Sequence, residues 1–478
     1  MSTPHSEPSS QRPTRRQLLR SAGMGLGGCA LNWLLQNDRA RGAPPRPLDL
    51  TPRRPHFPPR AKSVVMLLQN GGPSQMDLFD PKPALASGTG TVYREKVEMF
   101  QPGSEKNQLL SSPWEFTRHG QSGMDFSSAL PHTASVADEL CMVRSMHSEH
   151  NNHTEGLVMI TSGKIFPGRP TLGSWICYGL GTENQNLPAY VVLRDPQGYP
   201  STGSTLWQNG WLPAVYRGTQ IRTEGTPVLN LRPQHALPPG SREEDLAFLA
   251  QLNQRHRQDY PHDHILEARI RNYELAARMQ LEAAHTLDLK QETAATRKLY
   301  GIDNKTTAGY GTRLLMARRM VEAGVRFVHV FLNGAPWDSH NNVKDQIAEI
   351  APQTDLPTAG FIKDLAQRGL LGETIVLWTG EFGRLPVSQN GLGRDHNRNG
   401  FTALLAGGGF KAGHVHGATD EVGYRAVEDP VSVPDLFATI LHQLGLDHDA
   451  LTFHHQGRDE TLTDSAVSGA VVVDKLLT

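Results

Sequence analysis

The stretch from Glu373 to Gly409 constrains the fold most, because it places ionisable residues directly after an apolar run. Residues 374–377 (TIVL) are apolar and rich in β-branched side chains, which is typical of a strand buried on both faces. The loop that follows carries Glu381, Arg384, Arg394 and His396. Ligands of open α/β sheets bind outside the carboxyl ends of the strands, so this stretch predicts a metal or anion site there. A solvated loop with a capping glutamate is the alternative.

The same arrangement recurs along the chain. Apolar runs at residues 64–68, 140–144 and 325–332 each predict a buried strand, and each is followed by polar loop residues. The loops contribute Asp77, then His150, His153 and Thr154, and then Asp338 and His340. Helical patterns separate the runs, at residues 127–139, 171–179, 312–323, 356–368 and 433–444. Alternating strands and helices predict a three-layer α/β/α fold around a mostly parallel sheet.

Several of these residue types suit a metal ion. Asp338 and His340 are separated by one residue, so both side chains can reach one ion if the loop turns between them. A capping aspartate with an uninvolved histidine is the alternative. Asp77 is interpreted as a ligand or as a turn former. Thr154 is expected at the N-terminus of a helix over residues 156–161, where it serves as a plain cap or as a nucleophile favoured by the helix dipole.

Composition excludes some classes of protein. The chain has 478 residues and a formal net charge of −1, without a basic stripe interleaved with aromatic residues, so we expect no nucleic-acid partner. It contains 21 histidines, a weak indication of metal chemistry. Its three cysteines are too few and too scattered for a disulfide framework or a cysteine-based zinc site.

The first 43 residues are predicted to be a twin-arginine (Tat) export signal. Residues 14–20 (TRRQLLR) hold the two arginines and the apolar pair, and a weakly apolar, glycine-rich segment follows. Cleavage is expected after Ala40 or Ala43. Residues 26–29 (LGGC) also resemble a lipoprotein signal, which makes a lipid anchor the less favoured alternative.

The remaining chain divides by composition. Residues 44–61 are rich in Pro and Arg and predict an extended linker, and residues 62–465 form the α/β domain. Within it, residues 241–300 are charged, nearly free of Gly and helically periodic, which predicts a helical insertion rather than a membrane helix. Residues 466–478 are a polar tail. We expect no transmembrane helix once the signal is removed.

The ordered series of strand-end residues resembles the alkaline phosphatase and sulfatase superfamily. More closely, the chain is identified as a member of an uncharacterised bacterial family of Tat-exported, sulfatase-like proteins, the fifteen-hundred-and-first family of domains of unknown function. The matching motifs cover nearly the whole mature chain: residues 70–80 (NGGPSQMDLFD), 337–340 (WDSH), 380–384 (GEFGR), 393–396 (GRDH), 433–436 (VPDL) and 440–442 (ILH), together with the twin arginines.

The chain departs from the superfamily pattern at three places. Characterised sulfatases present Cys or Ser followed by Pro and Arg, where this chain has His153-Thr154-Glu155. The Asp-His pair of the superfamily's second strand end is here Glu381-Phe382, and Asn70 stands where family members often carry His. Each change removes a metal donor or a nucleophile. The resemblance therefore implies at most one complete metal site, or a degenerate binding pocket.

The resemblance implies an exported, metal-dependent hydrolase of sulfate or phosphate esters in the periplasm or cell envelope. A divalent ion (zinc, calcium, magnesium or manganese) would be held by Asp77, Asp338, His340, Glu381 and His396. Catalytic roles would fall to Thr154 as nucleophile, with Ser74 behind it, to His153 or His150 as general acid, and to Arg384, Arg394 and Lys164 as charge-neutralising groups. The substrate would be a sulfated or phosphorylated small molecule or polysaccharide. The alternative is a non-catalytic envelope protein that binds polysaccharide or a partner protein.

Overall fold

Strand β1 (Ser63–Leu68) lies inside the main sheet, and all of its residues are buried. It pairs in parallel with β7 (Phe327–Phe331) on one side and with β8 (Thr374–Thr379) on the other. Apolar residues at nearly every position explain this burial, because an inner parallel strand is covered on both faces. The strands predicted from the apolar runs of the sequence are confirmed here, with small shifts of their ends.

The computed structural model describes residues 49–225, 238, 240–260 and 264–478. The export signal predicted for residues 1–43, its cleavage site and the start of the linker lie outside the described residues.

The main sheet has the strand order β12-β4-β11-β8-β1-β7-β5-β6, and β15 also pairs with β4. The strands not yet introduced are β4 (Leu140–His147), β5 (Tyr190–Leu193), β6 (Thr219–Gln220), β11 (Phe401–Ala406), β12 (His414–His416) and β15 (Val431–Ser432). Strand β11 runs antiparallel to both of its neighbours, whereas the other described pairs of this sheet are parallel. The start of β11 therefore lies at the edge where β1, β4, β7 and β8 end.

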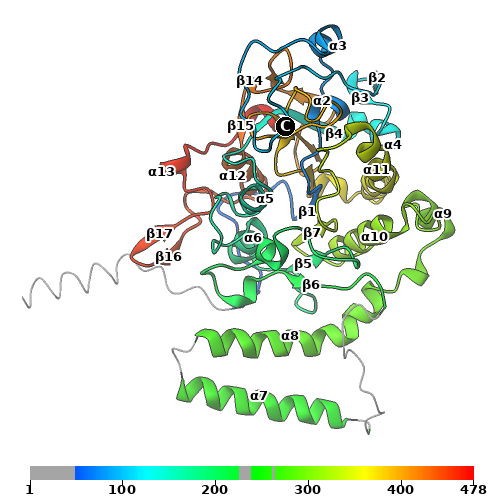
Figure 1. Cartoon of the computed structure of the whole chain (residues 1–478). Coiled ribbons are helices and arrows are strands. Elements are labelled where there is room, and N and C mark those ends of the chain that lie inside the picture. The colour runs from blue at the N-terminus through cyan, green and yellow to red at the C-terminus, as the bar shows by residue number, and fades with distance from the viewer. Residues whose placement is uncertain (1–48, 226–237, 239, 261–263) are drawn as a thin grey trace, which may run out of the picture. The chain divides into compact units, whose positions relative to one another are not determined.

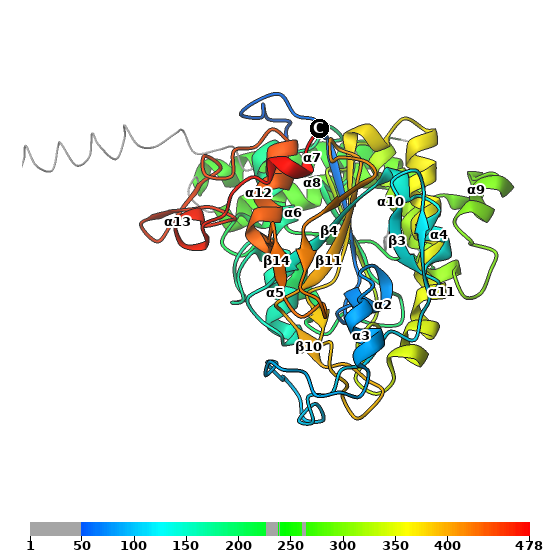
Figure 2. The ribbon, with the colours of Figure 1, turned by 90° about the horizontal axis from the view of Figure 1, so that it is seen from above.

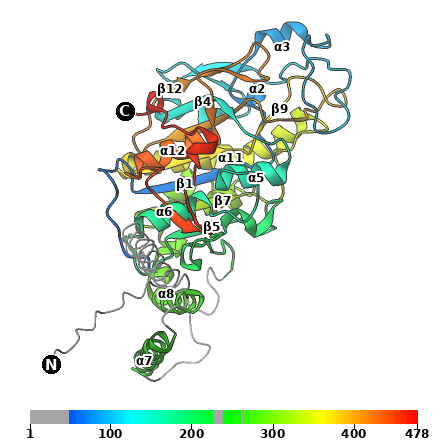
Figure 3. The same ribbon diagram turned by 90° about the vertical axis from the view of Figure 1, so that its left-hand side faces the viewer.

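Helices cover both faces of this sheet (Figures 1 and 2). On one face lie α4 (Pro131–Ala134), α10 (Ala308–Glu322) and α11 (Val343–Gln367). On the other face lie α5 (His153–Ser162), α6 (Leu172–Leu180) and α12 (Val433–Gln443), which stand in front of the strands in Figure 3. The predicted three-layer α/β/α fold with a mostly parallel sheet is confirmed.

Two helix predictions were wrong in their bounds. Residues 127–139 do not form one helix, because strand β3 (Met124–Ser127) ends there and Pro131 opens the short α4. In contrast, α11 begins at Val343 rather than at residue 356 and contains Pro352 and Pro357. Proline removes a helical hydrogen bond, but a long apolar face that is buried against the core keeps this helix continuous.

The charged stretch after residue 240 is helical, as its periodicity predicts. It contains α7 (Ser241–Asp259), α8 (His264–Thr286) and α9 (Ala294–Leu299). No helix in the described part of the chain is long and apolar enough to span a membrane.

A buried ion pair joins the short helix α2 (Gln75–Leu78), which follows β1, to the loop that precedes β11. Arg394 donates from Nε to Asp77 Oδ2 at 2.7 Å and from Nη2 to Asp77 Oδ1 at 3.2 Å, and both side chains are fully buried. The remaining donors of Arg394 reach main-chain carbonyls of Leu110, Leu385 and Pro386. Ser74 Oγ also donates to Asp77. This pair fixes the spacing of these two segments at the carboxyl edge of the sheet.

Substitution of Arg394 by Met should destabilise the fold severely, because the Asp77 carboxylate would stay buried without its partner. We expect a loss of about 3–5 kcal/mol in the free energy of unfolding, measured by urea denaturation. The matched control is Lys62→Met, which breaks the ion pair between Lys62 and Glu373. The side chains of these two residues are 54% and 55% exposed. That change should cost less than about 1 kcal/mol, and equal losses for the two variants would contradict the argument.

Candidate metal centre

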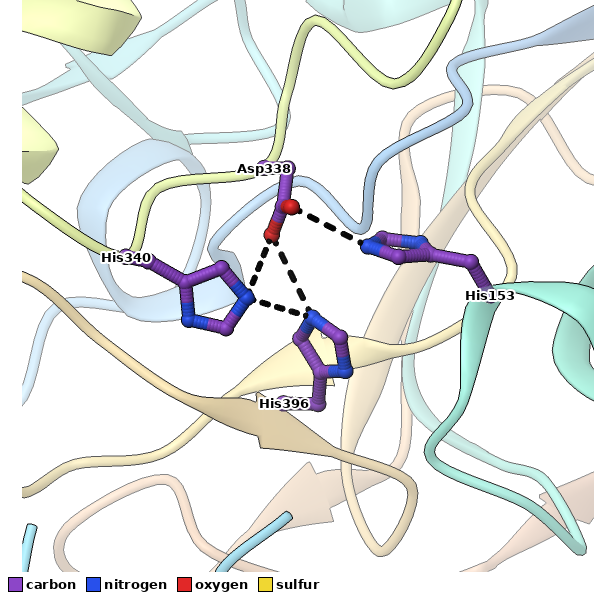
Figure 4. A group of neighbouring side chains, drawn as sticks. All are labelled: His153, Asp338, His340 and His396. Carbon is purple, nitrogen blue, oxygen red and sulfur yellow. Dashed lines mark hydrogen bonds and ion pairs between the residues drawn. The ribbon is translucent and has the colours of Figure 1, made fainter. Parts of the chain in front are cut away.

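Four side chains from three segments of the chain meet at the carboxyl edge of the sheet (Figure 4). His153 is the first residue of α5, Asp338 and His340 lie in the loop between β7 and α11, and His396 opens the short strand β10 (His396–Asn397) just before β11. One donor atom from each residue lies within 4.8 Å of the others. Donors bound about 2.0–2.2 Å from one ion lie roughly 3–4 Å apart, so the group has the size of a metal site.

The close approach of two loops brings Asp338 into this group. Gly71, just beyond β1, has a φ of +117°, and a Cβ there would lie 2.6 Å from the amide nitrogen of Trp337 and 2.7 Å from that of Asp338. A side chain at this position would therefore push the Asp338 loop away from the sheet.

The Nδ1 atom of each histidine faces a hydrogen-bond acceptor. For His153 the acceptor is the Glu381 carboxylate at 2.7 Å, for His340 it is Gln389 Oε1 at 2.5 Å, and for His396 it is the carbonyl of Asn151 at 2.6 Å. A carbonyl or a carboxylate can only accept, so each Nδ1 carries the proton. In the neutral rings, each Nε2 is then left with a lone pair, as metal-ligating histidines require.

The three Nε2 atoms lie close to one another and to the Asp338 carboxylate. The Nε2 atoms of His340 and His396 are 2.9 Å apart, and each lies near Asp338 Oδ1, at 2.9 and 3.2 Å. The buried Nε2 of His153 lies 3.2 Å from Asp338 Oδ2 but makes no hydrogen bond. Lone pairs this close repel one another unless a cation or a proton lies between them. The set of three imidazoles and one carboxylate therefore fits a divalent metal ion.

Arg384 holds the carboxylate of this set in place. Its Nη2 donates to Asp338 Oδ1 at 2.7 Å and also to the carbonyl of Gly71. Its other donors reach the carbonyls of Gly72 and Arg394, and the side chain is fully buried. The guanidinium is thus occupied by internal partners and serves to orient Asp338.

The pKa values of His153, His396 and Asp338 are all shifted by burial and by their neighbours. Burial alone would lower the pKa of His153, but the Asp338 and Glu381 carboxylates raise it to about 9. Burial lowers the pKa of His396 to about 3, so this ring is neutral. Burial alone would raise the pKa of Asp338, but its close contacts with the three histidines and with Arg384 lower it far below its usual range.

The centre is reachable from one side. The side chain of Asp338 is 26% exposed, and those of His153 and His340 are 16% and 14% exposed, whereas His396 is fully buried. This partial exposure lets solvent approach the group, and a solvent ligand would be a fifth donor beside the four side chains.

The other predicted site residues lie around this group rather than in it. Asp77 and Arg394 are bound to each other, and Glu381 supports His153 instead of offering an oxygen to the centre. Thr154 is the exposed second residue of α5. Lys164 lies beyond the far end of α5 and pairs with Asp464 at 3.2 Å. His150 lies 3.9 Å from Glu155.

Two supporting groups had no signal in the sequence. Gln389 orients His340 through its amide oxygen while its Nε2 donates to the carbonyl of Pro102, and the main-chain carbonyl of Asn151 orients His396. A glutamine in a glycine-spaced loop and a backbone carbonyl carry no distinguishing pattern. The role of His153 could have been inferred from its place at the start of a helix after a strand end.

Known structures of similar arrangement include three enzymes. The chain matches the lipoteichoic acid synthase LtaP from Listeria monocytogenes at 9% identity, over 85% of this chain and 76% of that one, with a TM-score of 0.33. It matches the phosphonate monoester hydrolase SpPMH from Silicibacter pomeroyi at 13% identity, over 72% and 73%, with a TM-score of 0.32. It matches the PsFucS1 sulfatase from Pseudoalteromonas sp. at 14% identity, over 81% and 68%, with a TM-score of 0.31.

No protein with a curated description matches the sequence. A family model matches residues 61–477 of the chain. This range includes the whole main sheet and the four residues of the candidate metal centre. The predicted membership is confirmed: the chain belongs to the family described as "Protein of unknown function (DUF1501)".

Proposed function

We propose that this protein is an exported, metal-dependent hydrolase of sulfate or phosphate esters. The observation that carries the proposal is the convergence of three Nε2 atoms, each on a ring whose Nδ1 faces an acceptor, on one carboxylate. The proposed ligands are His153, Asp338, His340 and His396. Three imidazoles favour zinc over calcium and magnesium, which prefer oxygen ligands.

When bound, the ion would supply Lewis acidity towards an ester oxygen and a lower pKa for a neighbouring water. Glu381 would hold the tautomer of His153, and Arg384 would hold the rotamer of Asp338. This proposal gives His153 the role of a ligand rather than that of a general acid. It also gives Arg394 a structural role, because all of its donors are engaged with Asp77 and backbone carbonyls.

Thr154 remains our candidate for a nucleophile. It is exposed, follows His153 directly and lies in the first turn of the ten-residue helix α5. The positive end of the helix dipole lowers the cost of negative charge on its hydroxyl or on a bound ester group. Attack by water would need neither Thr154 nor Ser74, whose hydroxyl already donates to Asp77.

A cavity beside the same loop could take the body of the substrate. It has a volume of about 340 Å³ and is lined in part by Asn333, Ala335 and Pro336, which precede Asp338, and by Gln346, which donates to the Asp338 carbonyl at 2.5 Å. Its other polar lining groups include Asp195 and Glu349. Such a lining suits hydroxyl groups, as in a sulfated or phosphorylated sugar.

The second candidate is a metal-holding envelope protein without catalytic activity that binds polysaccharide or a partner protein. It is favoured by the buried state of Arg384 and Arg394, because neither guanidinium is free to meet an anionic substrate. Both candidates share the metal centre and the proposed Tat export to the periplasm or cell envelope. They differ in whether ester hydrolysis accompanies metal binding.

Substitution of Asp338 by Asn should remove both metal and activity, because the carboxylate is the only anionic ligand of the proposed set. We expect zinc content, measured by mass spectrometry, to fall below about a tenth of an equivalent. Hydrolysis of p-nitrophenyl sulfate and p-nitrophenyl phosphate should fall on the order of 100-fold or more. The matched control is Asp459→Asn, which alters an Asp-His pair 69% exposed on the surface. An Asp338→Asn variant with full activity would exclude this site, and a metal-loaded wild type without activity would favour the binding protein.

Substitution of Glu381 by Gln should weaken the metal without removing it. The amide oxygen can still accept from His153 Nδ1, but it no longer makes the imidazole more basic. Zinc affinity, measured by competition with a chromophoric chelator, should fall about 10-fold, within the range found for partners that orient metal ligands. Unchanged affinity would show that Glu381 serves the fold alone, through its contact with the amide of Gly71.

A further inference from the structure

Residues 98–103 (EMFQPG) cross one side of the metal centre, and we call this segment the strap. The ring of Phe100 stacks on the imidazole of His396, with centroids 5.0 Å apart and planes 16° apart. Phe100 is itself 38% exposed, whereas His396 is fully buried. The strap is therefore one of the elements that separate this ligand from solvent.

Two polar side chains connect the strap to the ligands. Asp395 Oδ2 accepts from the amides of Phe100 at 2.7 Å and of Gln101 at 2.8 Å, while its Oδ1 accepts from the amide of His396 at 2.8 Å. Gln389 accepts from His340 Nδ1 and donates to the carbonyl of Pro102 at 2.9 Å. Each side chain therefore contacts the strap with one polar atom and a ligand residue with the other.

The ends of the strap are held by contacts outside the metal centre, and the carbonyl of its last residue, Gly103, accepts from the amide of Asn390 at 3.0 Å. Val97 is buried in a small apolar cluster with Met76, Leu385 and Val387. The Glu98 carboxylate accepts from Nε and Nη2 of Arg398, at 2.9 and 3.2 Å, in a pair whose side chains are 48% and 37% exposed. The middle of the strap, in contrast, is held by the ring contact of Phe100 with His396 and by hydrogen bonds with Asp395 and Gln389, both of which also contact a ligand residue.

We infer that docking of the strap and loading of the metal centre are thermodynamically coupled, with Phe100, Gln389 and Asp395 as positioning residues for His340 and His396. The inference rests on the metal site of the proposed function but does not require ester hydrolysis. A docked strap holds two ligand rings in the orientation that the ion needs, so less conformational freedom is lost on binding. By linkage, the ion must stabilise the docked strap by the same factor.

Gly103 gives a way to displace the strap without touching a ligand. Its φ is +115°, and a Cβ at this position would lie 2.6 Å from Asn390 Oδ1 and 2.9 Å from Gln389 Cγ. Alanine at position 103 would therefore be strained by the positive φ, and either the end of the strap or the side chains of Gln389 and Asn390 would have to shift, which disturbs the contact that orients His340.

Zinc affinity of the full chain, measured by chelator competition, tests one direction of the coupling. Phe100→Ala and Gly103→Ala should each weaken zinc binding about 10-fold, the lower end of the range for groups that orient ligands. Met99→Ala is the matched control: Met99 is 39% exposed on the same strap, and among the described contacts no hydrogen bond or ring contact joins it to a ligand. It should bind zinc within about twofold of the wild type.

Hydrogen exchange at the amides of Phe100 and Gln101 tests the other direction, because both amides donate to Asp395. Exchange should slow when zinc is added to the wild type. It should not respond to zinc in the His153→Ala variant, because this change removes a proposed ligand that is not among the residues contacting the strap. Zinc binding without any change in exchange would overturn the inference and leave the proposed function intact. Failure of the wild type to bind zinc would overturn both, whereas coupled zinc binding without ester hydrolysis would overturn only the proposed hydrolase.

Discussion

The electrostatic cost of gathering three imidazole Nε2 atoms and a carboxylate in one place is the constraint on which the rest of this site depends. A folded chain does not hold such groups together without a large electrostatic cost, unless a cation or protons relieve it. Here Glu381, Gln389 and the Asn151 carbonyl hold the three Nδ1 atoms and so keep the Nε2 atoms turned towards one another, while Arg384 neutralises part of the charge on Asp338. The surrounding loops serve chiefly to place these supporting groups.

The sheet makes this placement possible. Parallel strands β1, β7 and β8 deliver their following loops to one edge, and the reversed direction of β11 brings the residues before it to the same edge. His396 therefore reaches the site from the start of a strand, whereas Asp338 and His340 reach it after the end of one. A sheet without the antiparallel strand would carry His396 to the opposite side of the molecule.

Buried arginines organise the loops at this edge. Arg394 binds Asp77 and several carbonyls, and Arg384 binds three carbonyls and Asp338, so both act as internal braces. A planar guanidinium with five donors can satisfy several carbonyls of irregular backbone at once, which a lysine cannot do. Such bracing satisfies buried carbonyls of irregular backbone next to a polar centre. It also explains why these two cations are not free for a bound anion.

The sequence by itself determined the strands, the layered fold, the sheet edge that carries the site and the family of the chain, because apolar runs and strand-end motifs are local patterns. It also placed Asp338, His340 and His396 in one candidate set. Only the tertiary structure decided which acidic residues face that set. Asp77 turns to Arg394, and Glu381 turns to the outer nitrogen of His153. His153, which the sequence had suggested as a general acid, lies in the same group as Asp338, His340 and His396. A strand end fixes the edge at which a residue lies, but the direction of its side chain depends on partners distant in the sequence.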